Sequence, residues 1–198
     1  MTIFRFSNLV AGTWLAAAAM CSVTTNTAAQ EAPRIKFSTT AGVFVVEVYP
    51  DKAPKTVENF LQYVKDKHYD GTIFHRVIDN FMVQGGGFDA KYSQKPTRAP
   101  IPLEANNGLK NDVGTIAMAR TSNPNSATSQ FFINVKNNAM LNAPSPDGYG
   151  YTVFGKVVSG ADVIQKIKST PTGAGGPFPT DVPKTTILIN SATLEKKS

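Results

Sequence analysis

Groups that many enzymes use for hydrolysis or metal binding are scarce in this chain of 198 residues, which has one cysteine and two histidines. The cysteine, Cys21, lies near the amino terminus, and His68 and His75 do not have the four-residue spacing of helical zinc sites. No serine is flanked by glycines in the pattern of a nucleophile elbow. These absences argue against a hydrolase and a metalloenzyme, and we expect neither a metal ion nor another cofactor.

Long apolar runs are missing as well. The most apolar stretch, residues 9–20, is shorter than the ~20 residues that a membrane-spanning helix needs. Arg5 precedes this stretch and small residues follow it, which is the order found in secretory signal peptides. We therefore predict that residues 1–29 are a signal peptide cleaved after Ala29, giving a periplasmic or secreted protein without a stable membrane anchor. An acylated Cys21 is the competing interpretation, because a lipoprotein would stay attached to a membrane.

The charge of the chain gives little indication of a nucleic-acid partner. The formal net charge is +6, but the basic side chains are scattered between acidic residues and apolar segments. Nucleic-acid-binding proteins usually gather lysine and arginine on one face, so we expect no nucleic acid. Residues 30–198 contain no linker or internal repeat and are enough for a single domain, which must be stabilised by core packing without a disulfide. We expect this domain to be a monomer.

Short β-branched and aromatic runs recur along the predicted domain. They predict strands over residues 34–39, 43–49, 73–78, 81–84, 113–119, 131–135, 153–158 and 186–193. Apolar residues spaced three and four apart predict one helix that begins at Pro54 and another over residues 161–168. About eight strands in sequential order favour a closed antiparallel sheet, which leaves no free edges, although the pattern also permits a sandwich. Residues 85–112 lack periodicity and predict a long functional or mobile loop.

Two blocks of sequence carry the functional information. Residues 74–86 set Arg76 and Gln84 among large apolar side chains, and residues 114–120 with 129–133 add two adjacent aromatic residues and a short apolar strand. Together the blocks resemble the signature of the cyclophilin family of peptidyl-prolyl cis-trans isomerases.

This resemblance extends over residues 35–194, and the segments 105–111 and 128–130 resemble the exported bacterial branch of the family. It implies a fold dominated by β-structure, a closed eight-stranded antiparallel β-barrel capped by two α-helices, which agrees with the strand pattern. It also implies isomerisation of X-Pro bonds in proline-containing polypeptides that are unfolded or flexible.

Prolyl isomerisation suits a chain with neither a nucleophile nor a metal, because no covalent bond is made or broken. Its barrier of about 18–20 kcal/mol arises from amide resonance, and the barrier falls when a hydrogen bond draws the nitrogen lone pair out of conjugation. Arg76 is the candidate donor. One charged hydrogen bond supplies only about 1.5–3 kcal/mol, so the site must also desolvate the amide and hold the proline ring.

The resemblance assigns the remaining site residues. Gln84 matches the glutamine that binds a substrate carbonyl and orients the arginine, and the backbone of Ala119 and Arg120 matches the segment that holds the residue before proline. The apolar pocket for the proline ring corresponds to Phe81, Met82, Phe132 and Leu141. These apolar residues also permit a plain core interpretation, since most such residues are buried.

Three positions depart from the common family pattern. Met140 stands where many cyclophilins have tryptophan, and the loss of the indole predicts weak binding of the cyclic peptide cyclosporin. Tyr151 replaces a histidine but keeps a ring and a hydroxyl, so we expect it to preserve substrate binding. Arg120 replaces an asparagine and adds a charge at the rim, which makes pairing with acidic peptide residues possible.

The geometry of one turn stays open. A two-residue hairpin turn at Asp79 and Asn80 would place Arg76 on the sheet face opposite Met82 and Gln84. The resemblance, in contrast, places these side chains in one groove. Either the turn is bulged or the groove wraps around an edge.

The main alternative function is a non-catalytic module or chaperone that binds proline peptides in the same groove. Arg76 favours the enzyme, because binding alone does not need a cation directed at the amide nitrogen. His75 alternates away from Arg76 along the strand, so we expect an interior, hydrogen-bonded histidine and not an acid–base group.

Overall fold

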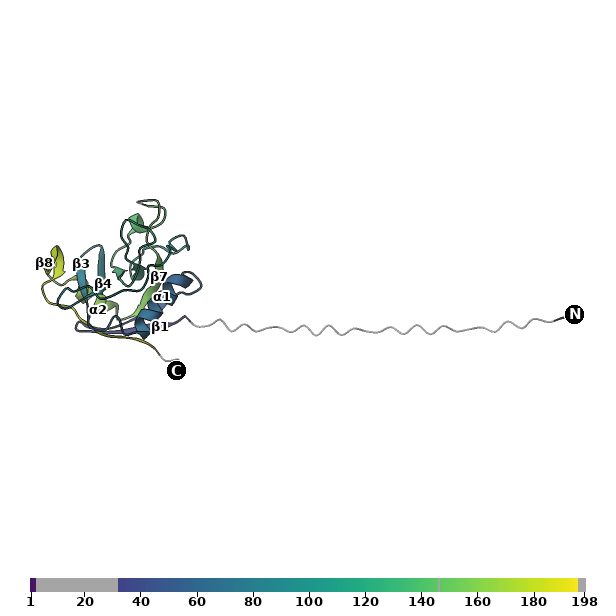
Figure 1. Cartoon of the computed structure of the whole chain (residues 1–198), viewed down its shortest axis with the longest axis horizontal. Helices are drawn as coiled ribbons and strands as arrows, with labels where there is room; N and C mark the ends of the chain where they lie inside the picture. Colours follow the sequence, from purple (N-terminus) through teal and green to yellow (C-terminus); the bar gives the residue numbers. More distant parts are fainter. Residues whose placement is uncertain (3–31, 146, 196–198) are drawn as a thin grey trace. The chain divides into compact units, whose positions relative to one another are not determined.

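The computed structural model describes residues 1–2, 32–145 and 147–195 (Figure 1). The strands are β1 (Arg34–Thr39), β2 (Gly42–Val48), β3 (Thr72–Ile78), β4 (Met82–Asp89), β5 (Thr115–Met118), β6 (Phe131–Asn134), β7 (Val153–Ser159), β8 (Thr172–Gly175), β9 (Phe178–Pro183) and β10 (Ile189–Leu194). The helices are α1 (Pro54–Lys65), α2 (Ala161–Lys168) and the short 3-10 helix η1 (Ala139–Leu141). Every predicted strand and both predicted α-helices are present, with ends that differ by a few residues.

Eight of the strands form one antiparallel sheet in the order β10-β1-β2-β7-β5-β6-β4-β3. The sheet curls until its two end strands approach each other, where Ile73 forms an isolated bridge with Leu188. The Phe74 amide also donates to the Ile187 carbonyl oxygen at 3.0 Å. Because these few contacts replace a continuous ladder between β3 and β10, the barrel is nearly closed and the prediction of a fully closed barrel is wrong in this respect.

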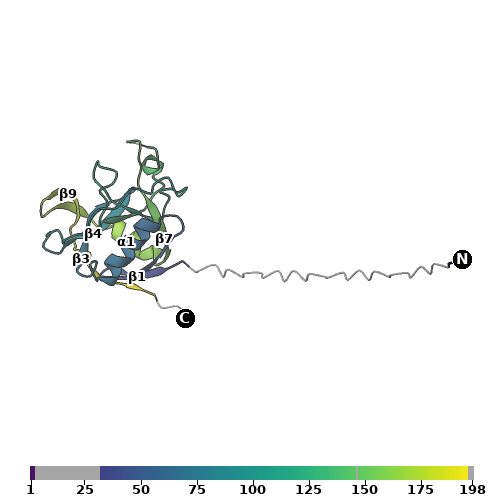
Figure 2. The same cartoon turned by 45° about the vertical axis from the view of Figure 1, so that its right-hand side comes forward.

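Alternating side chains of the strands fill the barrel together with one face of each helix. Phe37 of β1 and Phe44 of β2 point inward and stack with ring centroids 4.9 Å apart. Phe60 of α1 meets Phe131 edge to face at 6.1 Å. Helix α1 begins at Pro54, whose fixed φ and missing N–H suit a first helical turn, and in Figure 2 it lies between β4 and β7. The smaller helix α2 buries Val163, Ile164 and Ile167, as predicted.

The ribbon formed by β8 and β9 was not predicted. It lies beside β3 in Figure 1, and β9 contacts β3. The segment is rich in glycine and proline, and its pairing is irregular, with a register shift between Gly173 and Gly175. Asp181 in β9 adopts a left-handed conformation with φ 66°. These features hide the strand pattern from a reading based on alternating β-branched residues.

Two other expectations concern the ends of elements and of the chain. Strand β4 continues to Asp89, so the first residues of the predicted loop belong to the sheet. The predicted signal peptide, the cleavage after Ala29 and the alternative at Cys21 lie outside the described residues, apart from residues 1–2. In the described ranges, no helix combines the length and the apolar character needed to cross a membrane.

Candidate active site

Nearly all the predicted site residues surround one cavity of about 190 Å³. Its lining consists of Arg76, Phe81, Met82, Gln84, Ala119, Arg120, Phe132, Leu141 and Tyr151. Met140 is the exception, because its side chain is 58% exposed and does not line the cavity. The structure therefore brings together residues from β3, β4, β6 and three loops that are distant in sequence.

A three-residue connection between β3 and β4 resolves the geometry of the turn. Ile78 pairs with Met82, and the residues between them form the turn, with Asn80 in the left-handed region at φ 62°. Compared with a two-residue turn, the extra residue shifts the alternation of β4 by one position. As a result Arg76 lies directly opposite Gln84 and on the same face as Met82. The turn is thus longer than the simplest hairpin, as one of the two open alternatives required.

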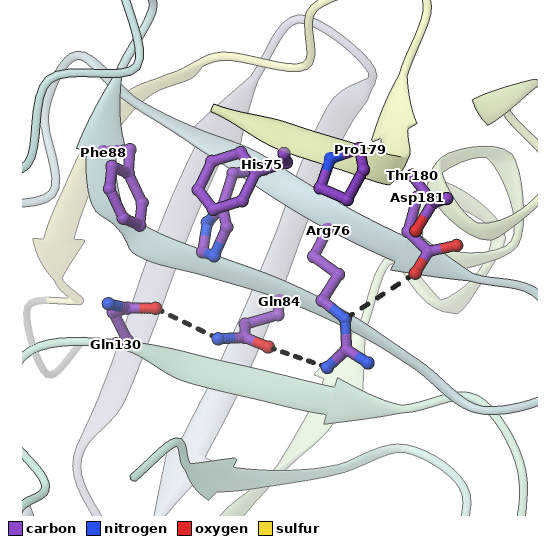
Figure 3. Close-up of a pocket in the computed structure, with 9 residues that line it drawn as sticks. His75, Arg76, Gln84, Phe88, Gln130, Pro179, Thr180 and Asp181 are labelled. Carbon is purple, nitrogen blue, oxygen red and sulfur yellow. Dashed lines mark hydrogen bonds and ion pairs between the residues drawn. The ribbon is translucent and has the colours of Figure 1, made fainter. Parts of the chain in front are cut away.

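Arg76 lines this cavity and also belongs to a row of polar side chains along an adjoining pocket (Figure 3). Its Nη1 donates to Gln84 Oε1 at 3.5 Å, and its Nε lies 3.9 Å from Asp181 Oδ2. Gln84 in turn donates through Nε2 to Gln130 Oε1 at 3.0 Å. The Arg76 side chain is 44% exposed and both of its contacts are long. Most of its N–H groups therefore remain free to bind a ligand.

Gln130 and Asp181 were missed as site residues. Gln130 lies inside the second sequence block. Its place in the site depends on Gly87, because any side chain at that position would put its Cβ 2.5 Å from the Gln130 side chain. Gly87 therefore leaves the space that Gln130 occupies. Asp181 gave no sequence signal, because the ribbon that carries it was itself not predicted.

The apolar part of the cavity is a small hydrophobic cluster, separate from the core of the barrel. Its buried members are Met82, Ala117, Phe132, Leu141 and Val153. Met82 and Phe132 are on paired strands that also send Val83 and Ile133 into the main core. Met82, Phe132 and Leu141 are thus buried, as the core interpretation required, whereas Phe81 is half-buried, and all four also line the cavity. Packing fixes their positions and leaves an apolar surface that suits a ring such as pyrrolidine.

A buried network of asparagine side chains supports this apolar surface. Asn138 Nδ2 donates to the Phe81 carbonyl oxygen at 2.8 Å, and Asn111 Nδ2 donates to the Leu141 carbonyl oxygen at 3.1 Å. Asn134 joins the two, since its Nδ2 donates to Asn111 Oδ1 at 3.2 Å and its Oδ1 accepts from Asn138 at 2.7 Å. Phe81 lies in the β3–β4 turn and Leu141 in the short helix η1, so neither has a strand ladder, and these hydrogen bonds fix their backbone instead.

Arg120 differs from its expected role at the rim. Its side chain is only 2% exposed, and its Nη2 donates to Asp147 Oδ2 at 2.6 Å. This hydrogen bond is the main cause that lowers the pKa of the Asp147 carboxyl. The guanidinium carbon lies 4.4 Å from the centroid of the Tyr151 ring. This charge is already paired within the protein, so the structure favours an internal role for Arg120, and pairing with acidic peptide residues stays an untested prediction.

His75 occupies the interior, as predicted. It is 3% exposed, and its ring packs against Phe88 and Phe178 with centroids 4.7 and 5.5 Å away. Burial, together with the charge of Arg76, lowers the pKa of His75 from 6.5 to about 4. The ring is therefore neutral near pH 7. A hydrogen bond with the Ile73 backbone acts on this pKa in the opposite, upward direction, whereas Nδ1 has no partner at full hydrogen-bond geometry among the described residues.

A second cavity of about 510 Å³ adjoins the first and shares Arg76 and Gln84 with it. Its walls come from β3, β4 and the ribbon strand β9, and Figure 3 shows Pro179 and Asp181 on the side opposite Gln84 and Gln130. Within the described ranges, no three His, Cys, Asp or Glu side chains group as they would around a metal ion.

Comparisons with known proteins agree with this geometry. The family model "Cyclophilin type peptidyl-prolyl cis-trans isomerase/CLD" matches residues 34–194. Peptidyl-prolyl cis-trans isomerase cyp18 of Streptomyces antibioticus is 56% identical over 162 residues, which cover 81% of this chain and 97% of that protein. Peptidyl-prolyl cis-trans isomerase B of Escherichia coli is 52% identical over 164 residues, covering 82% and 99%.

A solved structure supports the same assignment. The crystal structure of a cyclophilin type peptidyl-prolyl cis-trans isomerase from Cryptosporidium parvum has a TM-score of 0.69 at 25% identity and covers 84% of this chain and 99% of its own. The family resemblance inferred from the two sequence blocks is confirmed, whereas membership of the exported branch stays a prediction. The chain belongs to the cyclophilin-type peptidyl-prolyl cis-trans isomerases.

Proposed function

We propose that this isomerase acts on X-Pro bonds of exported proteins while they fold, and that Arg76 is its principal catalytic residue. The observation that carries the proposal is the position of Arg76. It lines the cavity together with apolar side chains, opposite Gln84, and has only long contacts to other side chains. Uncatalysed X-Pro isomerisation takes tens to hundreds of seconds, which is slow enough to limit folding.

The proposed mechanism uses the two halves of the site differently. The apolar side chains, Met82 and Phe132 among them, hold the proline ring while the other side of the bond rotates. Arg76 donates to the proline nitrogen as the amide twists and the nitrogen becomes pyramidal. Since this lone pair is available only in the twisted state, the hydrogen bond stabilises that state more than either planar isomer. Gln84 binds a substrate carbonyl and keeps the guanidinium in place, and the backbone at Ala119 and Arg120 holds the residue before proline.

A binding module or chaperone that uses the same cavity is the alternative. It would need the apolar pocket but no cation at its mouth. A protease-coupled proline-peptide assay on residues 30–198 separates the two, because it measures conversion of the cis isomer and not binding. We expect turnover well above the uncatalysed rate. Binding of the peptide without acceleration would contradict the proposal.

The proposed location is the periplasm or the cell exterior. Support comes from the order of charged, apolar and small residues in residues 1–29. The expected mature protein begins at Gln30, is a monomer, and carries no stable membrane anchor. Mass measurement of the protein extracted from the cell envelope tests this. An intact Met1, or a diacyl group on Cys21, would contradict it.

Weak binding of cyclosporin follows if this inhibitor occupies the same cavity. Met140 is exposed and provides neither the hydrogen-bond donor nor the rigid face of an indole. A missing hydrogen bond of about 0.5–1.5 kcal/mol, with lost packing of similar size, weakens binding by about one to two orders of magnitude. We expect Met140→Trp to restore this affinity while turnover changes little. An inhibition titration checks it, with Tyr149→Trp as a control that adds an indole at another exposed position.

A further inference from the structure

We propose that Arg120 and Asp147 are positioning residues, whose ion pair clamps the ring of Tyr151 against Phe132 and so fixes one wall of the cavity. The inference rests on the proposed role of this cavity in holding proline. In this proposal the Arg120 side chain stabilises the cavity wall and does not bind acidic residues of the peptide. Four observations carry it, namely the donors of Arg120, the stack on Tyr151, the contact with Phe132 and the double task of Asp147.

The hydrogen-bond donors of Arg120 are engaged inside the protein. Nε and Nη2 both donate to the Gly150 carbonyl oxygen, at 3.0 and 2.8 Å. Nη2 also donates to Asp147, and Nη1 donates to the Thr121 carbonyl oxygen at 2.9 Å. A guanidinium offers five N–H groups in a fixed plane. With four of them directed at these three partners and the side chain 2% exposed, the Arg120 guanidinium presents almost no surface to a peptide.

The plane of this guanidinium covers the Tyr151 ring. The separation of 4.4 Å from the guanidinium carbon to the ring centroid is that of a cation–π contact. The Tyr151 ring also meets Phe132 edge to face, with centroids 5.7 Å apart. The Tyr151 amide donates to the Leu141 carbonyl oxygen at 2.9 Å, which fixes its backbone. The ring is thus restrained both by Arg120 and by Phe132, a residue that lines the cavity.

Asp147 performs two tasks with one carboxylate. Its Oδ2 accepts from Arg120, while its Oδ1 accepts from the amides of Tyr149 and Gly150 at 3.0 and 3.3 Å. The second task shapes the loop that delivers the Gly150 carbonyl oxygen to Arg120. An asparagine at this position keeps an Oδ1 acceptor for the loop, but it loses the charge and presents an amide group to the guanidinium. Asp147→Asn therefore separates the clamp from the turn.

The experiment measures turnover of a proline peptide by Asp147→Asn. We expect KM to rise by about tenfold, equivalent to about 1.4 kcal/mol, while kcat changes by less than about twofold because Arg76 is untouched. Asp162→Asn is the matched control, since it removes one carboxylate from an exposed pair with Lys166 at 3.8 Å on α2. An unchanged KM in Asp147→Asn, or an equal fall in kcat, would overturn the clamp.

A double-mutant cycle tests whether the pair acts through the ring. In Tyr151→Leu the stack is absent, so adding Asp147→Asn should raise KM no further. Two independent increases would show that the ion pair acts by another route. Peptides with glutamate or lysine beside the X-Pro bond provide a second arm. Equal kcat/KM for both in the unmodified enzyme supports the internal pairing of Arg120, and a strong preference for glutamate would contradict it.

These outcomes are distinct from failure of the proposed function. If the unmodified domain does not accelerate isomerisation, the proposed function fails. If it turns over normally and Asp147→Asn has a normal KM, only the clamp fails. The melting temperature of each variant is measured in parallel, because a purely structural role would lower it without the split between KM and kcat.

Discussion

Arg76 and Arg120 lie on the same cavity but are held in opposite ways. The Arg76 side chain is 44% exposed, with contacts of 3.5 and 3.9 Å, whereas Arg120 is 2% exposed, with hydrogen bonds of 2.6 to 3.0 Å. Their sequence contexts do not distinguish them, since each lies in one of the two sequence blocks that resemble the family signature, close to apolar strand residues. The difference shows that an arginine can bind a substrate only if some of its N–H donors are not already hydrogen-bonded within the protein.

This contrast has an energetic reason. Removing the partner of a buried, paired guanidinium strongly destabilises the fold, because the remaining charge is then buried without compensation. A half-exposed guanidinium can exchange water for a ligand at little cost. We therefore expect substitutions near Arg120 to act on stability and binding, and substitutions near Arg76 to act on turnover.

The largest expected effect is at Phe132, whose ring packs against Tyr151 on the Arg120 side of the cavity. Phe132→Ala removes a buried ring that packs on Tyr151, so we expect a loss of about 3 kcal/mol in the free energy of unfolding and weaker peptide binding. Urea unfolding and peptide titration measure the two effects. Phe88→Ala is a useful comparison, since that ring lines only the second cavity. Normal stability of Phe132→Ala would show that this wall is not supported by packing.

A second prediction concerns the buried neighbour of Arg76. The pKa of His75 is about 4 in the fold and 6.5 in the unfolded chain, so its stabilisation is complete above pH 6.5 and is lost as the pH falls toward 4. The shift corresponds to about 3 kcal/mol. Lowering the pH from 7 to 4 should therefore reduce the free energy of unfolding of the unmodified protein. The reduction should be about 3 kcal/mol larger than in His75→Gln. An equal loss in both proteins would contradict the lowered pKa.

The third prediction tests the catalytic arginine itself. Arg76→Ala should lower kcat/KM by about ten- to a hundredfold, since a charged hydrogen bond supplies about 1.5–3 kcal/mol. The melting temperature and peptide affinity should change much less, because the side chain is exposed. Arg98→Ala is the control, as it removes another exposed arginine whose partner is Asp66 at 3.6 Å. Near-normal turnover in Arg76→Ala would reject the proposed mechanism.

The smallest expected effect is at Asp181. Its carboxylate is the only described ion-pair partner of Arg76, at 3.9 Å, and exposed pairs contribute about 0.2–1 kcal/mol. Asp181→Asn keeps a residue that tolerates the left-handed conformation and should lower kcat/KM by no more than about fivefold. A larger fall than in Arg76→Ala would show that Asp181 acts on the substrate and not through the arginine.

Much of the fold could be predicted because its signals are local. Alternating apolar residues indicated the strands of the barrel, and the spacing of Val57 and Phe60 indicated α1. The β8–β9 ribbon could not be predicted in this way. Its strands are held by backbone pairing between segments rich in glycine and proline, and by contact with β3, so local propensity contains no trace of them.

The sequence by itself determined the family, the order of the eight barrel strands along the chain and the cavity residues apart from Met140, because motif residues such as Arg76 and Gln84 keep their identity and spacing. Only the tertiary structure decided how these groups are used. The weak pairing of Arg76 with Asp181 and the tight pairing of Arg120 with Asp147 join residues that are distant in sequence. The near closure of the barrel likewise depends on a distant contact, between Ile73 and Leu188. Pairing of charges across loops is a property of distances in space, and no local pattern encodes it.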